Sequence, residues 1–213
     1  MNNDSVDRLA KLFLKFPGIG ERQARRFAYF ILTQQEGYVD SLARALIAAR
    51  SHANTCSRCL RIFESTTRSS GDLCDICSDE HRDQHSIIVV EKSQDIESFA
   101  RTAYNGLFFV LGGLIPIVQK DIIQGTNAQK LIDRVATENA SGLLSEIILA
   151  FPVTPNGEHT DSALRELLEP VLTTGADSTH SPHITSLGRG LSTGAELEYA
   201  DPASLEASLK KRE

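Results

Sequence analysis

The sequence lacks any uninterrupted apolar run long enough to suggest a membrane span. Its longest uncharged stretch, residues 102–119, is broken by glycines, a proline and an asparagine, so its apolar part predicts a buried strand and a loop. The first eleven residues contain acidic side chains and no apolar core, so we expect neither a secretory signal nor a transit peptide, and a cytoplasmic location. No repeat of about 20–50 residues and no low-complexity tract is present, which excludes solenoids and linker-rich scaffolds.

Tryptophan is absent and cysteine is scarce, with four residues among 213. A chain of this length buries about 70% of its extended surface on folding, so it does not depend on disulfides as a small secreted domain does. The four cysteines therefore need another explanation.

Charge is unevenly distributed along the chain. The formal net charge is -6, but residues 1–55 carry eight Lys and Arg against five Asp and Glu, a net charge of +3, and the remainder carries -9. A basic N-terminal head thus precedes an acidic body. The negative total charge therefore does not exclude nucleic-acid binding by the head.

Two helical patterns in the head are joined by a glycine-containing turn, Pro17-Gly18-Ile19-Gly20. Glycine at positions 18 and 20 allows backbone amides to approach a ligand closely, and the N-terminus of the helix that follows favours a phosphate. Three arginines have the spacing to share a face of that helix: Arg22, Arg25 and Arg26. Such side chains would hold a nucleic-acid backbone and would not read base sequence.

A Gly-x-Gly turn by itself favours a plainer interpretation, a turn in a helical bundle beside solvated arginines. The longer pattern from Leu12 to Arg26 resembles the helix-hairpin-helix motif, and the resemblance implies DNA binding through phosphates without sequence preference. A third amphipathic helix should follow and pack on the first two. Five of its apolar residues are expected to face inward: Val39, Leu42, Ala43, Leu46 and Ile47.

The cysteines form two identical pairs, Cys56-x-x-Cys59 and Cys74-x-x-Cys77, separated by fourteen residues. Two such pairs in a chain without an expected secretion signal predict a tetrahedral zinc site with four thiolate ligands. A closed shell of four cysteines leaves no position for a catalytic water, so the site should be structural and should contribute to folding. A redox pair and two unrelated buried pairs are the alternatives.

After the cysteines, short apolar runs alternate with helical patterns. The runs at 87–90, 107–111 and 147–150 predict strands, and the stretches at 93–104, 127–137 and 160–172 predict helices. This alternation predicts an α/β fold with a largely parallel sheet covered on both faces. Functional side chains in such sheets gather at the carboxyl ends of the strands, where Glu91, Gly112-Gly113 and the 152–158 loop follow the apolar runs.

The strand that ends at Glu91, with a later strand followed by Glu158, resembles the Toprim fold of topoisomerases, primases and certain nucleases. The enzymes of that class hold magnesium with a glutamate and an Asp-x-Asp pair, because hard cations prefer several carboxylate oxygens. This sequence contains no Asp-x-Asp. Two separated carboxylates make a weak magnesium site, so we expect no catalysis.

The order of hairpin, four-cysteine finger and Toprim domain resembles the RecR family of bacterial recombination mediators over essentially the whole chain. The similarity extends to residues 184–201, which resemble the closing, Walker B-like segment of that family. The sequence departs from the family pattern at several places: Asn156 stands in place of a glutamate, Leu114 stands in place of a histidine, and the segments 116–120 and 192–195 also differ. Asp201 followed by Pro202 also predicts the start of a final helix.

The resemblance implies a four-part α/β chain. The parts are a helical DNA-binding head at 1–53, a four-cysteine zinc finger at 54–82, a Toprim domain at 83–175 and a C-terminal segment at 176–213. It further implies that the protein forms a homo-oligomer, either a dimer or a tetrameric ring, and that it has no enzymatic activity. The residues expected to contact DNA are Gly18, Gly20, Arg22, Arg25 and Arg26, and those expected to hold zinc are Cys56, Cys59, Cys74 and Cys77.

The family's function gives the expected partners. The protein should bind single-stranded, gapped or duplex DNA at the nucleoid and help load RecA onto strands coated by single-strand-binding protein. RecO, joined by RecF, should be its protein partner, with Glu91 and Glu158 facing RecO. The alternatives are a magnesium-dependent Toprim nuclease or primase-like enzyme, in which the two glutamates would be catalytic, and a zinc-ribbon adaptor that binds no DNA.

Overall fold

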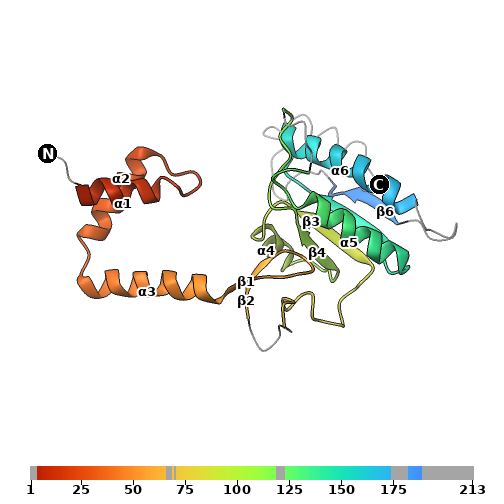
Figure 1. The fold of residues 1–213 in the computed structure, drawn as a ribbon, viewed down its shortest axis with the longest axis horizontal. Helices are drawn as coiled ribbons and strands as arrows, with labels where there is room; N and C mark the ends of the chain where they lie inside the picture. The colour runs from red at the N-terminus through yellow and green to blue at the C-terminus, as the bar shows by residue number, and fades with distance from the viewer. Residues whose placement is uncertain (1–3, 66–68, 70, 119–122, 174–181, 189–213) are drawn as a thin grey trace, which may run out of the picture. The chain divides into compact units, whose positions relative to one another are not determined.

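The computed structural model describes residues 4–65, 69, 71–118, 123–173 and 182–188, and the chain forms two units, residues 1–53 and 54–213. The first unit contains three helices, α1 (Asp4–Phe13), α2 (Glu21–Leu32) and α3 (Glu36–His52) (Figure 1). The second contains the cysteines, a parallel sheet and its helices. No described helix is long and apolar enough to cross a membrane.

Helices α1 and α2 pack through small residues. Val6 and Ala10 of α1 and Ala24 and Ala28 of α2 are buried against one another, and Leu9, Phe13 and Ile19 cover this contact. Alanines on facing helices allow a close approach but bury little apolar area. Pro17 disfavours helical backbone at the residue before it, which accounts for the end of α1 ahead of the hairpin.

Helix α3 is present as predicted, but its five apolar side chains do not all face inward: Val39 and Leu42 are half-buried, and the other three are exposed. No residue of α3 is buried, and Leu46 and Ile47 remain 62% and 70% exposed. The sequence period correctly indicates a helix with apolar residues. It does not say which surface covers them, and the described residues of the head bury none of them fully.

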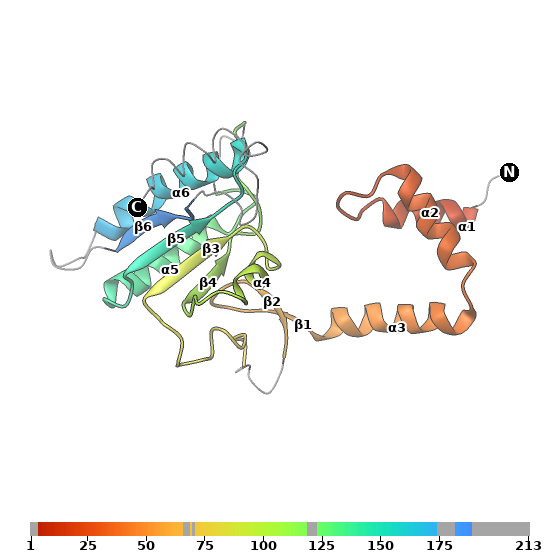
Figure 2. The same ribbon diagram turned by 180° about the vertical axis from the view of Figure 1, so that it is seen from behind.

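The sheet of the second unit has four strands in the order β4-β3-β5-β6, and every neighbouring pair is parallel. The strands are β3 (Ser86–Val90), β4 (Leu107–Val110), β5 (Glu146–Ala150) and β6 (His183–Ser186). Helices connect them, as Figures 1 and 2 show, because parallel strands require crossover connections. The predicted α/β fold with a largely parallel sheet is confirmed.

Both faces of the sheet are buried, as the continuous apolar runs of its strands require. Ile87 and Val89 point to the face covered by α5 (Ala128–Ala140) and α6 (Pro155–Thr173). Ile88 and Val90 point to the opposite face, against the short helix α4 (Asp95–Phe99) and residues of the cysteine finger. The predicted helix at 93–104 is therefore shorter than expected, and residues 100–106 form a turn and loop that return the chain to β4.

The cysteine finger begins with a two-stranded sheet made of β1 (Ala53–Thr55) and β2 (Ile62–Glu64). Its small core consists of the four cysteines and Phe63. Residues 184–188, the start of the expected Walker B-like segment, are described and belong to β6 and the two residues after it; the rest of that segment and the Asp201 cap lie outside the described residues.

Candidate metal centre and nucleic-acid interface

The structure brings the four predicted ligands together. All four cysteines are buried and unpaired by disulfides, and their sulfur atoms lie within 4.8 Å of one another. The Sγ atoms of Cys59 and Cys74 are 3.7 Å apart. A tetrahedral metal with bonds of about 2.3 Å to sulfur places its ligands about 3.8 Å apart, so this cluster fits a metal ion.

The crowding of the four thiols shifts their pKa values in opposite directions. Hydrogen bonds with Cys59 and the other two cysteines lower the pKa of Cys56, whereas the hydrogen bonds with Cys56 raise the pKa values of Cys59 and Cys77. The cause is mutual: four crowded thiols cannot all ionise without a cation. A divalent metal allows all four to be thiolates.

Backbone hydrogen bonds position the first knuckle, the Cys-x-x-Cys turn at residues 56–59. The Leu60 amide donates to the Cys56 carbonyl over 2.9 Å, and the Cys74 amide donates to the Cys56 sulfur over 3.4 Å. The turn requires a left-handed backbone at Leu60, with a φ of 62°, which is uncommon for a residue other than glycine. The Leu60 side chain packs against buried residues of the sheet, which gives this leucine a packing role that glycine could not supply.

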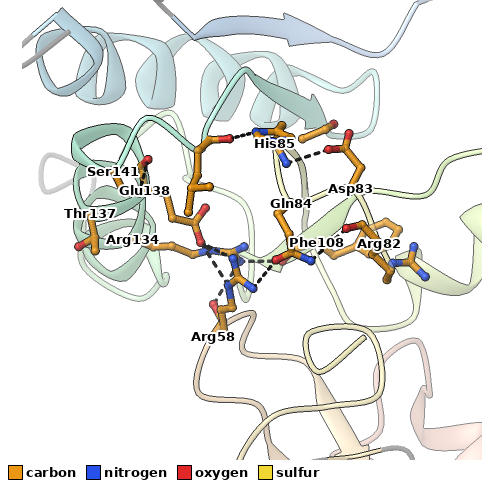
Figure 3. Close-up of polar contacts among 12 residues, drawn as sticks. Arg58, Arg82, Asp83, Gln84, His85, Phe108, Arg134, Thr137, Glu138 and Ser141 are labelled. Carbon is orange, nitrogen blue, oxygen red and sulfur yellow. Dashed lines mark hydrogen bonds and ion pairs between the residues drawn. The ribbon is translucent and has the colours of Figure 1, made fainter. Parts of the chain in front are cut away.

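A buried ionic cluster fastens the first knuckle to the α/β domain (Figure 3). Arg58, between the first two cysteines, donates to Glu138 Oε1 of α5 over 3.0 and 3.2 Å and to Gln84 Oε1 over 2.8 Å. Arg134 Nε donates to the same Glu138 oxygen over 3.0 Å. The side chains of Arg134 and Glu138 are only 8% and 10% exposed, so water screens this cluster weakly.

The finger also completes the edge of the sheet. Arg134 Nη1 donates to the carbonyls of Arg58 and Phe108, and the Val110 amide of β4 donates to the Cys59 carbonyl over 2.8 Å. The outer edge of β4 is therefore partly satisfied by the knuckle itself. Sequence reasoning did not single out Arg58, Gln84, Arg134 or Glu138, because nothing in their local pattern distinguishes them from surface charges.

The glycine hairpin of the head has the geometry expected of an anion-binding turn. Gly18 adopts a left-handed backbone with a φ of 75°, and Gly20 is the extended N-cap residue of α2. No side chain caps the N-terminus of α2. A side chain at Gly20 would meet no protein atom within 4 Å, so the space in front of these amides is open to a ligand.

The three predicted arginines of α2 differ in their surroundings. Arg25 Nη2 lies 3.2 Å from Asp7 Oδ1, an ion pair that joins α2 to α1. Arg26 donates to Gln23 one turn earlier, over 3.3 Å, and Arg22 and Arg26 are both exposed. Their roles in binding remain predictions, and Arg25 has a structural partner that the sequence pattern did not indicate.

Glu91 and Glu158 lie after the neighbouring strands β3 and β5, at the carboxyl edge of the sheet. Glu91 pairs with Lys92 Nζ over 2.9 Å. A cleft of about 390 Å³ beside β5 and β6 includes Glu158 and Asp161 but not Glu91 in its lining. Across the described residues, the cysteine cluster is the one group of three or more ligands close enough to hold a metal.

The substitution of asparagine at position 156 has a structural role here. Asn156 Oδ1 accepts a hydrogen bond from the Ile117 amide over 3.4 Å, and Thr160 Oγ1 accepts one from the Ile115 amide over 2.8 Å. The first turn of α6 thus anchors the loop that follows β4. Gly157 sits so close to the Pro152 carbonyl that a Cβ would collide with it, which fixes glycine at this turn.

Comparison with known proteins gives two family matches. A family described as "RecR, helix-hairpin-helix" matches residues 6–50, and a Toprim domain family matches residues 85–177. The chain is 34% identical over 209 residues to the recombination protein RecR of Chloroherpeton thalassium, covering 98% of this chain and 96% of that protein. It is 33% identical to the recombination protein RecR of Pediococcus pentosaceus, covering 98% of this chain and 96% of that protein. It is also 33% identical to the recombination protein RecR of Chlorobium luteolum, covering 99% of this chain and 97% of that protein.

Proposed function

Because the chain belongs to the RecR family of recombination proteins, we propose that it is a DNA-binding recombination mediator that catalyses no reaction itself. The observation that carries the proposal is the head: an uncapped helix N-terminus behind a glycine hairpin, with exposed Arg22 and Arg26 on the same helix. Backbone amides and guanidinium groups bind phosphates irrespective of base sequence. The family supports RecA loading on single-stranded DNA coated by single-strand-binding protein as the purpose of this binding.

The four-cysteine cluster is proposed to hold zinc with a structural role. Its ligands are Cys56, Cys59, Cys74 and Cys77, and a closed thiolate shell selects zinc over harder cations. The metal would supply cross-linking of the finger, not chemistry on a substrate. The finger packs against the sheet through Leu60 and Ile76, so it holds part of the Toprim domain in place.

The carboxyl edge of the sheet is proposed to bind RecO, with RecF as a further partner. Glu91 and Glu158 lie at this edge, and the body carries a strongly negative net charge that suits a basic partner. The cleft lined by Glu158 does not include Glu91, and neither glutamate belongs to a group of three metal ligands in the described part of the chain, which favours a docking role over magnesium chemistry.

Self-association into a dimer or a tetrameric ring is proposed through the head. Leu46 and Ile47 of α3 are largely exposed, and Tyr38 on the same helix is about half exposed. Large apolar side chains gathered on one helix are typical of a surface that another chain covers. The protein would act in the bacterial cytoplasm, at the nucleoid where its DNA substrate lies.

The DNA-binding proposal is tested by charge reversal on α2. We expect Arg22→Glu with Arg26→Glu to weaken binding of labelled DNA at least about ten-fold and to reduce the salt dependence of the affinity by about two phosphate contacts. Fluorescence anisotropy at several salt concentrations measures both. Arg44→Glu with Arg50→Glu, on α3 of the same unit, makes the same change in charge. An equal loss in both variants would contradict a specific role of the hairpin.

The absence of catalysis and the docking of RecO have their own tests. Incubation of labelled DNA with protein and magnesium should leave the DNA intact; cleavage that Glu91→Gln abolishes would establish the nuclease alternative instead.

Glu91→Lys with Glu158→Lys should abolish co-elution with purified RecO. Glu166→Lys with Glu169→Lys, on the exposed side of α6, is the matched control, and retained co-elution in the first variant would contradict docking at this edge.

A further inference from the structure

Three phenylalanines form an aromatic column that ends at the glycine hairpin. The rings of Phe13 and Phe16 are stacked, with centroids 5.9 Å apart and planes inclined by 27°. The Phe13 ring in turn packs edge-on against Phe27 of α2, at 5.7 Å and 73°. The column therefore starts between the two helices and continues outward to Phe16.

The outer end of this column is open. Phe13 and Phe27 are partly buried, whereas Phe16 is 55% exposed. An exposed phenylalanine usually gains stability by turning toward the core, but here its ring rests on Phe13. One side of the Phe16 ring is thus supported by protein, and much of the ring remains available to a ligand.

Backbone hydrogen bonds hold Phe16 at the hairpin. Its amide donates to the Phe13 carbonyl over 3.0 Å, and its carbonyl accepts from the Ile19 amide over 3.3 Å. The second bond closes the turn in which Gly18 is left-handed. Phe16 therefore belongs to the same turn as the hairpin amides that are proposed to bind phosphates, and its ring is positioned by Phe13.

We propose that Phe16 is a stacking platform for an unpaired nucleobase, so that the head prefers single-stranded or gapped DNA over an intact duplex. The proposal rests on the proposed DNA-binding function and adds a determinant of specificity to it. A nucleobase presents a flat π-face of any sequence, and aromatic side chains bind such faces beside a basic groove. In an intact duplex both faces of each base are already stacked on neighbours, so Phe16 gains nothing there.

Phe16→Leu keeps an apolar residue of similar size and removes the flat ring, and Phe16→Trp retains a ring. We expect Phe16→Leu to weaken binding of a single-stranded oligonucleotide about ten-fold, the size of one base–aromatic stack. Affinity for covalently closed circular duplex, which has neither ends nor unpaired bases, should stay unchanged. Phe16→Trp should retain the wild-type preference. Tyr29→Leu is the matched control, since Tyr29 is 52% exposed on α2 outside the column.

The experiment uses the full-length, metal-loaded protein, an oligonucleotide that contains 2-aminopurine, and light scattering. Stacking on Phe16 should quench 2-aminopurine fluorescence in the wild type and not in Phe16→Leu. Equal losses for both DNA forms, or no loss for either, would overturn the proposal. So would a change in oligomeric state with unchanged DNA affinity, which would assign Phe16 to a protein interface. Failure of the DNA-binding function itself is distinct, because the wild type would then bind neither DNA form.

Discussion

The two units of this molecule bury their large apolar side chains to different extents. In the second unit, leucine, isoleucine and phenylalanine side chains of the sheet are fully enclosed by helices and by the cysteine finger. In the head, the buried contact between α1 and α2 consists of one valine and three alanines, and large side chains such as Leu46 and Ile47 stay exposed. Apolar stabilisation scales with buried area, so the second unit should carry most of the stability, while the head leaves large apolar side chains exposed.

The two units also differ in how far their charged side chains are buried. The side chains of Arg134 and Glu138 are buried, Arg58 beside them is partly buried, and the three bind the finger to the sheet. Arg22 and Arg26 are exposed, and the Arg25–Asp7 pair of the head is open to solvent. Buried charges must be paired to be tolerated, whereas exposed arginines keep their capacity to bind phosphate. The comparison predicts that changes in one unit leave the other largely intact.

Loss of the metal site should have the largest effect. We expect Cys59→Ser, or chelation of the wild type, to destabilise the second unit by several kcal/mol, because metal binding contributes directly to the folding of such fingers. Hydrogen exchange should rise in β4 and around the knuckle while α1 and α2 keep their protection. Restoring zinc should reverse chelation in the wild type but not in Cys59→Ser. Equal loss of protection in both units would break the comparison.

Neutralising the buried carboxylate should come next. Glu138→Gln keeps the shape of the side chain but leaves the Arg58 and Arg134 guanidiniums without their shared negative charge. Breaking one partner of a buried ion cluster costs about 3 kcal/mol. Denaturant unfolding of the full chain measures the loss, with Glu166→Gln on the exposed side of α6 as the control. A loss no larger than that of the control would show that this cluster is energetically inert.

Leucine truncation compares the units directly. Leu131→Ala removes a fully buried side chain of the sheet core and should cost about 3 kcal/mol. Leu46→Ala on the exposed α3 should change the stability of the isolated chain by less than about 0.5 kcal/mol. Thermal unfolding at low protein concentration gives both values. If both variants were destabilised similarly and independently of concentration, α3 would have an intramolecular partner after all.

The smallest effect is expected at the hairpin. Gly18→Ala forces a Cβ into left-handed backbone at a φ of 75° and should cost about 1 kcal/mol, confined to the head. Gly20→Ala has an ordinary φ and open space around it, so it should alter stability little but impede the approach of DNA. Unfolding and anisotropy measurements on both variants separate the two effects. A larger stability loss at Gly20 than at Gly18 would contradict this assignment.

Features with a local cause could be predicted from the sequence. The Cys-x-x-Cys pairs, the glycine hairpin and the alternation of strands with helices all follow from residues that are neighbours along the chain. Apolar periodicity located α5 and α6 well, but it extended α4 too far. The reason is that residues 100–106 make contacts far along the chain: the Tyr104 hydroxyl lies within hydrogen-bond distance of the Ser86 carbonyl, at 3.1 Å and 18 positions away.

The sequence alone thus determined three features: the spacing of the cysteines, the φ required at Gly18 and the apolar runs of the strands. Each of them depends on residues that are close together along the chain. Tertiary structure alone decided the rest. Arg58 and Glu138 are separated by 80 positions and meet only because the finger packs on α5. Glu91 and Glu158 share an edge, but the cleft lined by Glu158 does not include Glu91, and the described residues of the head leave the apolar side chains of α3 without full burial. Such contacts depend on how distant elements pack and not on local pattern.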